Sequence, residues 1–355
     1  MECDGYPYPL VPKINQQNEY NFYLPYQTND GKYFGKLACS MYYHRSKVAK
    51  SNTATTTTAT ANSTATPAKP KPVDLDTNIP FVVICHGYQS WRNQMLLSFL
   101  SGGLHTTGGY NVVRFDFMCN GHSTCCSTAS GSASSGDGAG GEDDDNDVCY
   151  YSNFNGEYDN LQTLIRYIQN ELQSKVACII GHSKSCYNVL KVASQASEQG
   201  EDKPNTIPCF VTMSGRYYIP NTYDITKRFD DPTVIEELNS GKGKVVVGKC
   251  GKRDCVITAE DIKQRNELDS KALVSSISNS NNAHVLTIHG TKDDLIPITD
   301  AYKFHDTLMP KDGNNHHELY IIDGADHNYN GLKYNKQLVA TISNFIKKHY
   351  RKKVK

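Results

Sequence analysis

The sequence predicts an α/β protein built on a mostly parallel, doubly wound sheet. Short apolar runs rich in β-branched residues recur along the chain, and segments with helical periodicity separate them. Polar segments that contain glycine follow the ends of several of these runs, which is where such sheets bind ligands. The chain has 355 residues, and single α/β domains often exceed about 250, so we expect one domain over residues 1–355.

The expected elements follow one another in chain order. An N-terminal hairpin precedes the first core strand. Core strands are expected at residues 81–85, 112–117, 176–180, 284–288 and 319–322, because each run is apolar and β-rich. Apolar residues recur at helical spacing from Leu161 to Leu172 and from Leu338 to Ile346. These two segments should be helices that pack against the faces of the sheet.

Two stretches are expected to be unstructured inserts. Residues 46–74 are rich in threonine, alanine and proline, and they hold too few large apolar side chains to offset the entropy of ordering them. Residues 123–148 are rich in serine and glycine and then acidic. Their carboxylates match no standard calcium-loop spacing, so we expect a surface insert there.

A third segment, residues 216–282, interrupts the alternation of strands and helices. It contains several tyrosines, a glycine- and lysine-rich patch at 241–252, and a helix expected from Thr258 to Leu273. Because it lies between two core strands, we expect it to form a cap over the binding edge of the sheet. A cap of this kind excludes water and shapes a pocket, although a plain surface excursion is the alternative.

Composition excludes several classes of protein. Lys plus Arg and Asp plus Glu both number 37, so the formal net charge is zero and nothing predicts binding to nucleic acid or to an anionic membrane. No apolar run approaches the ~18 residues of a membrane-spanning helix. The basic residues from Lys347 onward are expected to be a solvated helix end.

The 12 cysteines are scattered, and several lie inside expected strands. No apolar leader segment precedes them, so buried free thiols in a reducing, cytoplasmic compartment explain them better than disulfides do. Cys250 and Cys255 lack histidine partners at zinc-ligand spacing. We therefore expect no metal and no cofactor.

The segment Gly181-His182-Ser183-Lys184-Ser185 carries the strongest chemical signal. It follows an apolar strand and precedes a helical pattern, which is the layout of a nucleophile elbow. Such a sharp turn presents the serine hydroxyl at the carboxyl edge of the sheet and requires small neighbours. Ser185 stands where the common pattern G-x-S-x-G has its second glycine.

An elbow serine needs a histidine base and a carboxylate, which follow it in the order Ser, Asp, His when this turn lies in an α/β sheet. Asp293 and Asp294 come just after the strand expected at 284–288, and His327 comes just after the strand expected at 319–322. Both segments therefore lie at the edge where Ser183 emerges. The order along the chain is also the expected one.

Taken together, these segments resemble the α/β-hydrolase superfamily. The resemblance is closest to its serine aminopeptidase-like and cinnamoyl or feruloyl esterase-like branch, which is related to monoacylglycerol lipases. It covers the chain from about residue 78 to the C-terminus and rests on ICHGYQS at 84–90, RFDFMCNGHS at 114–123, GHSKS at 181–185, MSGRYY at 213–218, HGTKDDLIP at 289–297 and IIDGADHNY at 321–329.

The resemblance implies an α/β-hydrolase fold and a serine hydrolase of carboxylesterase type, with Ser183 as nucleophile, His327 as base and Asp293 as the residue that orients the base. Asp294 is the alternative to Asp293, and the family register favours Asp293. The backbone N–H groups of Tyr88 and Lys184 are the expected oxyanion donors. The substrate is expected to be a small-molecule ester.

Several alternatives stay open at this point. Peptidase or acylglycerol lipase activity would use the same residues, and a catalytically idle scaffold that binds a small ligand would keep the same fold. The acyl and alcohol groups and the oligomeric state are not defined by the sequence. His86 and His182 are expected to have structural roles, Asp116 to brace its own loop, and Cys186 to be a packed thiol.

Overall fold

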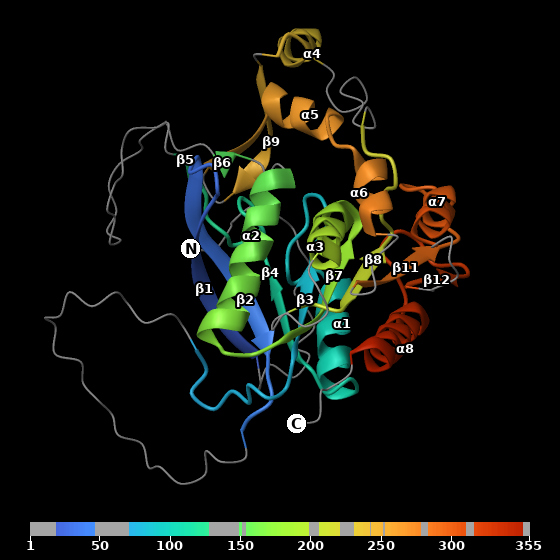
Figure 1. Cartoon of the computed structure of the whole chain (residues 1–355). Helices are drawn as coiled ribbons and strands as arrows, with labels where there is room; N and C mark the ends of the chain where they lie inside the picture. The colour runs from blue at the N-terminus through green and yellow to red at the C-terminus, as the bar shows by residue number, and fades with distance from the viewer. Residues whose placement is uncertain are drawn as a thin grey trace, which may run out of the picture.

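The computed structural model is organised around one large sheet (Figure 1). Its strands follow the order β1-β2-β4-β3-β7-β8-β11-β12, and the short strand β5 (Cys126–Ser127) pairs with β2 at the side. The structure describes residues 19–46, 71–127, 149–150, 154–198, 206–220, 231–241, 243–250, 253–277, 283–309 and 316–350.

The predicted N-terminal hairpin is confirmed. Strands β1 (Glu19–Gln27) and β2 (Tyr33–Tyr42) pair antiparallel, and β2 continues antiparallel onto β4. Along β1 the side chains of Phe22, Leu24 and Tyr26 are buried while the alternate positions are exposed. This alternation is typical of an antiparallel edge with one solvated face.

The parallel part of the sheet is buried on both sides except at its outermost strand, β12. It consists of β4 (Asn111–Phe115), β3 (Phe81–Cys85), β7 (Val176–His182), β8 (Cys209–Met213), β11 (His284–Gly290) and β12 (His317–Ile322). Every residue of β3, β4, β7 and β8 is buried. Strands covered on both faces have continuous apolar sequences, which explains why these runs were recognisable.

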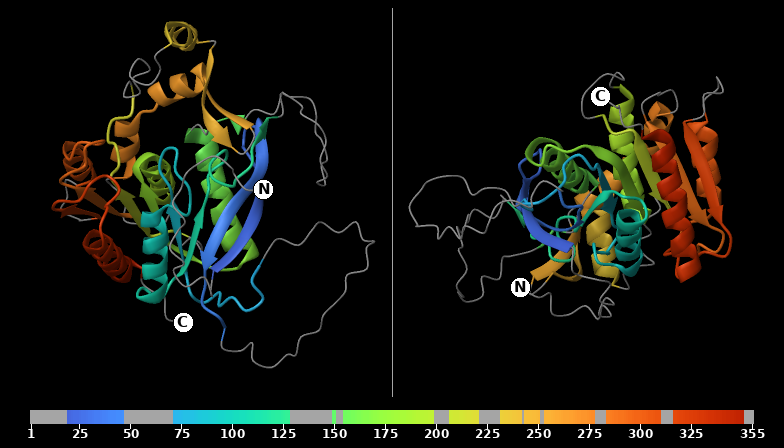
Figure 2. Two further views of the ribbon diagram at one scale, coloured as in Figure 1. Left: turned by 180° about the vertical axis from the view of Figure 1, so that it is seen from behind. Right: turned by 90° about the horizontal axis from the view of Figure 1, so that it is seen from below.

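Helices cover both faces of the sheet, as Figure 2 shows. Helices α1 (Met95–Thr106) and α8 (Leu332–His349) pack on one face with side chains such as Val82 and Ile84. Helices α2 (Phe154–Arg166), α3 (Cys186–Glu198) and α7 (Thr299–Leu308) pack on the other face with Val83 and Cys85. The alternation of side chains along β3 therefore separates two cores.

The order of the strands places a switch point beside β3. The chain passes from β3 through α1 to β4 on one side of it, and later returns to β7 on the other side. In open α/β sheets, ligands bind at the carboxyl ends of the strands beside such a point, which is where the loops after β3 and β7 lie. Both predicted oxyanion donors and Ser183 lie in these two loops.

The segment predicted as a cap forms a separate layer of structure near one end of the sheet (Figure 1). It contains α4 (Pro232–Asn239), β9 (Lys244–Cys250), β10 (Arg253–Thr258), α5 (Ala259–Asn266) and α6 (Ser270–Ile277). Strand β10 pairs with β9 and with the short strand β6 (Cys149–Tyr150), so residues about 100 positions apart form a small second sheet.

The prediction of a single helix from Thr258 to Leu273 is wrong in one respect, because two helices, α5 and α6, occupy this stretch. Thr258 caps α5, with its hydroxyl accepting a hydrogen bond from the Asp261 N–H. Helix α5 ends at Asn266, and the Asp269 carboxylate accepts a hydrogen bond from the Ala272 N–H at 2.8 Å at the start of α6. Aspartate at this position favours a helix start over a continuous helix.

Most of the two predicted inserts lies outside the described residues. The described ends are structured: residues 123–127 contain the buried Ser123 and the strand β5, which pairs with β2. Residues 71–74 likewise precede a bridge between Leu75 and Arg45. The insert predicted at 123–148 therefore begins later than the sequence indicates, because Ser123 bonds the Asp116 carbonyl and the Ala38 N–H.

Candidate active site

Ser183 follows β7 directly and is held in a strained backbone conformation. Its φ is 56°, in the left-handed region that residues with side chains seldom adopt. A short turn of 3₁₀-helix, Ser183–Ser185, connects it to α3. A Cβ atom at Gly181 would lie 2.8 Å from Val189 Cγ2 and 3.0 Å from the Cys186 nitrogen. Only glycine fits there, as a nucleophile elbow requires.

Ser185 fits the elbow although it replaces the usual glycine. Its side chain is fully buried, and its hydroxyl accepts a hydrogen bond from the His182 N–H at 2.9 Å. The same hydroxyl lies 3.1 Å from the carbonyl oxygens of both Cys85 and His182. The serine therefore ties the elbow to the neighbouring strand β3. A buried hydroxyl with these partners carries no uncompensated desolvation.

Asp293 and His327 meet at the carboxyl edge of β11 and β12. His327 Nδ1–H donates to Asp293 Oδ2 at 2.8 Å, and the aspartate side chain is completely buried. The other carboxylate oxygen, Oδ1, accepts from the backbone N–H groups of Leu295 and Ile296 at 3.0 and 2.8 Å. Asp294, the alternative, is exposed to solvent.

The protonation state of Asp293 follows from these contacts. Burial alone would raise its pKa, but the hydrogen bonds from His327 and Ile296 and the nearby imidazoles lower the pKa below its ordinary value. His289 contributes to this environment, with its Nε2 at 3.4 Å from Asp293 Oδ2 and at 2.9 Å from the Ile296 carbonyl. Asp293 is therefore a carboxylate that can hold an imidazole in one orientation.

His182 connects the elbow to the histidine of the other loop. Its Nε2–H donates to the His327 carbonyl oxygen at 2.9 Å, and the two rings lie 5.1 Å apart. Burial and the adjacent His327 lower the pKa of His182 to about 4, so this ring is neutral. The expected structural role of His182 agrees with these contacts. Within the described residues, no hydrogen bond joins the Ser183 hydroxyl to the His327 ring.

The loop after β3 passes against the elbow. A Cβ atom at Gly87 would lie 3.1 Å from Ser183 Cβ and 3.2 Å from the His182 carbonyl oxygen. Tyr88 follows this contact directly, and the next residue, Gln89, has a φ of 49°. Lys184 lies on the other side of Ser183, as the next residue in the chain. The residues predicted to supply the two oxyanion donors therefore flank the serine.

Two other expectations about side chains near the site are confirmed. Asp116 braces its own loop, because its carboxylate accepts from the His122 N–H at 2.9 Å and forms a buried ion pair with Arg92. Cys186 is a packed thiol whose Sγ lies 3.3 Å from the Gly181 carbonyl oxygen. Burial raises the pKa of Cys186 to about 12, which leaves the thiol protonated and unreactive.

A buried ion pair next to Ser183 was not predicted from the sequence. Lys184 Nζ lies 2.8 Å from Glu157 Oε1, and the exposed fractions of the two side chains are 8% and 3%. Asn188 Nδ2 donates to the other oxygen, Glu157 Oε2, at 3.2 Å. Glu157 lies in α2, and no motif relates it to the elbow. A glutamate in an amphipathic helix ordinarily indicates a solvated face.

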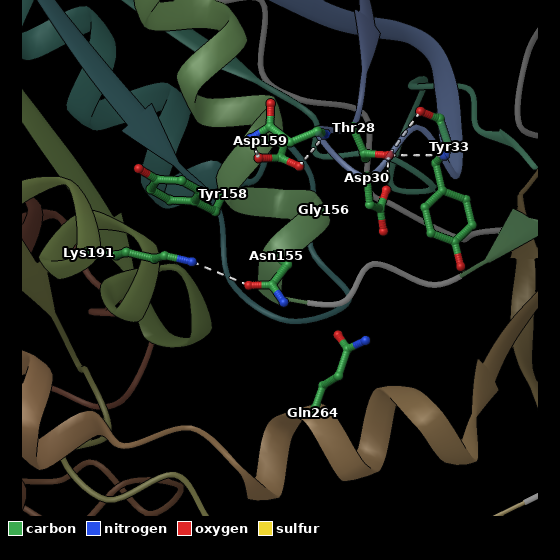
Figure 3. Close-up of a pocket in the computed structure, with 10 residues that line it drawn as sticks. Thr28, Asp30, Tyr33, Asn155, Gly156, Tyr158, Asp159, Lys191 and Gln264 are labelled. Carbon is green, nitrogen blue, oxygen red and sulfur yellow. Dashed lines mark hydrogen bonds between the residues drawn. The ribbon is translucent and has the colours of Figure 1, made fainter.

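A polar cavity of about 270 Å³ lies between the β1–β2 turn, α2, α3 and α5 (Figure 3). Its lining residues bond to one another: the Asp159 carboxylate accepts from the backbone N–H of Asn29 at 2.8 Å, and Lys191 Nζ lies 3.3 Å from Asn155 Oδ1. None of the predicted triad or oxyanion residues lines this cavity. It is therefore distinct from the elbow.

Comparisons with known proteins agree with this architecture. The model of the prolyl oligopeptidase family matches residues 250–353, a segment that includes Asp293 and His327 and excludes Ser183. No curated protein matches the chain.

Solved structures of esterases and hydrolases have the same fold. Est1E from Butyrivibrio proteoclasticus is 12% identical with a TM-score of 0.53, covering 94% of this chain and 99% of its own. The Pyrococcus furiosus esterase Pf2001 is 16% identical with a TM-score of 0.54, covering 97% and 99%. A protein from Agrobacterium vitis S4 that is named as a hydrolase is 14% identical with a TM-score of 0.56, covering 92% of this chain and 99% of its own.

These likenesses show that the chain has the α/β-hydrolase fold, as predicted, and they support a hydrolase. They also agree with the resemblance to the esterase-like branch. Within the described residues, none of the helices combines the length and apolar character needed to cross a bilayer. The same part of the chain contains no group of three or more His, Cys, Asp or Glu side chains suited to hold a metal ion.

Proposed function

We propose that this protein is a serine hydrolase that cleaves carboxylic esters through Ser183, His327 and Asp293. The observation that carries the proposal is the buried Asp293–His327 hydrogen bond of 2.8 Å, at the same sheet edge as a serine with a φ of 56°. A carboxylate, an imidazole and an elbow serine are the parts that nucleophilic acyl transfer needs.

Each residue has a distinct role in the proposed reaction. His327 Nε2 takes the proton of Ser183 as the hydroxyl attacks the ester carbonyl, and Asp293 keeps the other ring nitrogen protonated. The backbone N–H groups of Tyr88 and Lys184 stabilise the oxyanion of the tetrahedral intermediate. His327 then protonates the leaving alcohol, and water attacks the acyl-enzyme by the same route in reverse.

Ser183 and His327 lie in loops that another histidine connects. The His182–His327 contact joins residues 145 positions apart in sequence, so it supports a common site. In the part of the chain that the structure describes, the Ser183 hydroxyl makes no hydrogen bond to the His327 ring, and catalytic hydrogen bonds of this kind often tighten only when substrate binds.

The choice of esters rests on the similar structures. Est1E has been solved with ferulic acid bound, and Pf2001 is described as an esterase. The family match to prolyl oligopeptidases favours peptide hydrolysis as a second candidate function. Both reactions use the same nucleophile and base, so only the substrate separates them.

A panel of substrates tests this choice. Purified protein is assayed with short-chain esters, long-chain esters, aryl esters and aminoacyl amides of matched leaving group. We expect short or aromatic acyl esters to give the highest kcat/KM. Equal or better turnover of an aminoacyl amide would assign the protein to the peptidases. An idle scaffold would hydrolyse none of them and would not react with a fluorophosphonate.

Two further features belong to the proposal. The segment 216–282 serves as a cap, since its helix α5 lies near α2: Arg265 Cζ lies 5.7 Å from the centre of the Phe154 ring. The protein works in a reducing, cytoplasmic compartment, which suits the burial of cysteine side chains such as Cys85, Cys178 and Cys209.

A further inference from the structure

The Lys184–Glu157 ion pair joins the elbow to helix α2. Lys184 follows the nucleophile in sequence, Glu157 lies in the first turns of α2, and Nζ and Oε1 are 2.8 Å apart. Both Glu157 oxygens are occupied, since Oε2 accepts from Asn188 Nδ2, and Asn188 is completely buried in α3. Three elements therefore meet at one carboxylate.

Two aromatic rings lie near the ammonium group of Lys184. Nζ lies 4.9 Å from the centre of the Phe154 ring and 6.0 Å from the centre of the Tyr88 ring. Both distances lie within the range of cation–π attraction. The side chain of Lys184 thus contacts the residue that supplies the other proposed oxyanion donor. One ammonium group links the two loops that flank Ser183.

The energetics of this pair indicate a role other than stability. Moving two charges out of water costs several kcal/mol each, and the mutual attraction of a buried pair often only offsets that loss. Burial accordingly lowers the pKa of Lys184, although the attraction of Glu157 acts in the opposite direction. Apolar residues of similar volume would stabilise this position at least as well.

Catalysis explains why charges are kept there. An oxyanion donor acts only when its N–H points at the position of the developing charge, and a misplacement of about 1 Å can reduce the rate about 100-fold. The elbow is strained, with Ser183 at a φ of 56°, so it needs contacts that oppose relaxation. Ser185 supplies one such contact on β3. Lys184 supplies the other on α2.

We propose that Lys184 and Glu157 are positioning residues that fix the two oxyanion donors relative to Ser183. This inference rests on the proposed function. Lys184 contributes its backbone N–H to the oxyanion, while its side chain, held by Glu157 and seated against Tyr88, determines where that N–H and the loop after β3 lie.

Glu157→Gln and Lys184→Met test the proposal, because each removes one charge and keeps the side-chain length. Initial rates on a short-chain ester give kcat and KM, and a trifluoromethyl ketone, which forms a tetrahedral oxyanion with the serine, gives an inhibition constant. We expect kcat to fall about 10- to 100-fold with KM nearly unchanged. Affinity for the ketone should fall by the same factor.

The double variant Glu157→Gln/Lys184→Met separates positioning from stability. Without either charge the double variant should unfold at a temperature close to that of wild type, because no unpaired charge is left buried. Its kcat should nevertheless stay as low as that of the single variants. Recovery of kcat together with stability would overturn the proposal and leave the pair with a structural role only.

Lys191→Met is the matched control. Lys191 lies two turns further along α3, with Nζ at 4.3 Å from the centre of the Tyr158 ring and 3.3 Å from Asn155 Oδ1, and it borders the cavity drawn in Figure 3. Removing this ammonium should leave kcat and ketone affinity within about threefold of wild type, because it contacts neither loop beside Ser183. A loss equal to that of Lys184→Met would also overturn the proposal.

The outcome for the pair is distinguishable from the outcome for the proposed function. If Ser183→Ala abolishes ester hydrolysis while Glu157→Gln is as active as wild type, the positioning role is refuted and the serine mechanism stands. If Ser183→Ala is fully active, the proposed function itself fails, and the positioning role fails with it.

Discussion

Replacing Asp293 by asparagine should disable the histidine through its tautomer. The backbone N–H groups of Leu295 and Ile296 donate to Asp293 Oδ1 at 3.0 and 2.8 Å, so the oxygen of an asparagine would take that position. The amide NH₂ would then face His327 Nδ1, where the carboxylate now accepts a hydrogen bond from Nδ1–H at 2.8 Å. The ring would have to protonate on Nε2, which could no longer accept the proton of Ser183.

The magnitude follows from the unmade hydrogen bonds. An asparagine flipped the other way would leave both backbone N–H groups facing an NH₂. The Leu295 N–H is exposed and can turn to water, whereas the Ile296 N–H is partly buried, and a buried donor without a partner costs roughly 1–3 kcal/mol. The flip is therefore disfavoured by roughly 1–3 kcal/mol. The longer contact of 3.4 Å from His289 to Oδ2 is too weak to reverse this. A wrong tautomer reduces kcat by about 10⁴-fold, or about 5.5 kcal/mol in the barrier.

The assay is the initial rate of ester hydrolysis by Asp293→Asn and by Asp294→Asn, after both variants are shown to melt as wild type does. Asp294 is exposed, so its variant should stay within a few fold of wild type. Asp293→Asn with more than about a tenth of wild-type kcat would refute the tautomer argument. A large loss in Asp294→Asn instead would transfer the orienting role to Asp294.

Three further outcomes are expected. Ser185→Ala should reduce the free energy of unfolding by roughly 1–3 kcal/mol in urea titrations, because the His182 N–H loses its acceptor. Unchanged stability would show that the Ser185 hydroxyl does not hold the elbow. Acidification should also destabilise the fold. Burial lowers the pKa of His182 to about 4 and that of His317 to about 3 in the folded protein. Between about pH 6.5 and those values, these rings therefore bind protons only in the unfolded chain. Stability should therefore fall by about 2 kcal/mol per histidine between pH 7 and pH 5, and a His317→Gln variant that keeps the full pH dependence would exclude His317 as a source. Cys186→Ser should retain kcat within a few fold, since the thiol stays protonated; a loss of orders of magnitude would give Cys186 a part in the chemistry.

The parallel strands were the most predictable part of the fold. Strand β3 has the predicted bounds, Phe81–Cys85, because both of its faces are buried and its sequence is a continuous apolar run. The carboxyl ends of such strands meet at one edge, so the motifs after β7, β11 and β12 could be assigned to one site from sequence order alone. The contact between Asp293 and His327 is the clearest instance.

Long-range pairing of short or polar segments was not predictable. The two-residue strand β6 (Cys149–Tyr150) carries no periodic signal, and its partner β10 lies about 100 residues away. Glu157 looks like any surface residue of an amphipathic helix, and only the fold brings it to Lys184. The division of the helix predicted from Thr258 to Leu273 was, in contrast, predictable. Asp269 is a helix-capping residue inside that segment, and it marks the start of a second helix.

Covalent labelling of Ser183 tests the central claim most directly. The protein is treated with a fluorophosphonate, its intact mass is measured, and the modified peptide is mapped by fragmentation, with Ser183→Ala treated in parallel. The mechanism predicts one adduct per chain, located on Ser183, with ester hydrolysis lost in proportion to labelling, and neither labelling nor activity in the variant. Ester hydrolysis that persists in a folded Ser183→Ala variant would contradict the proposed mechanism.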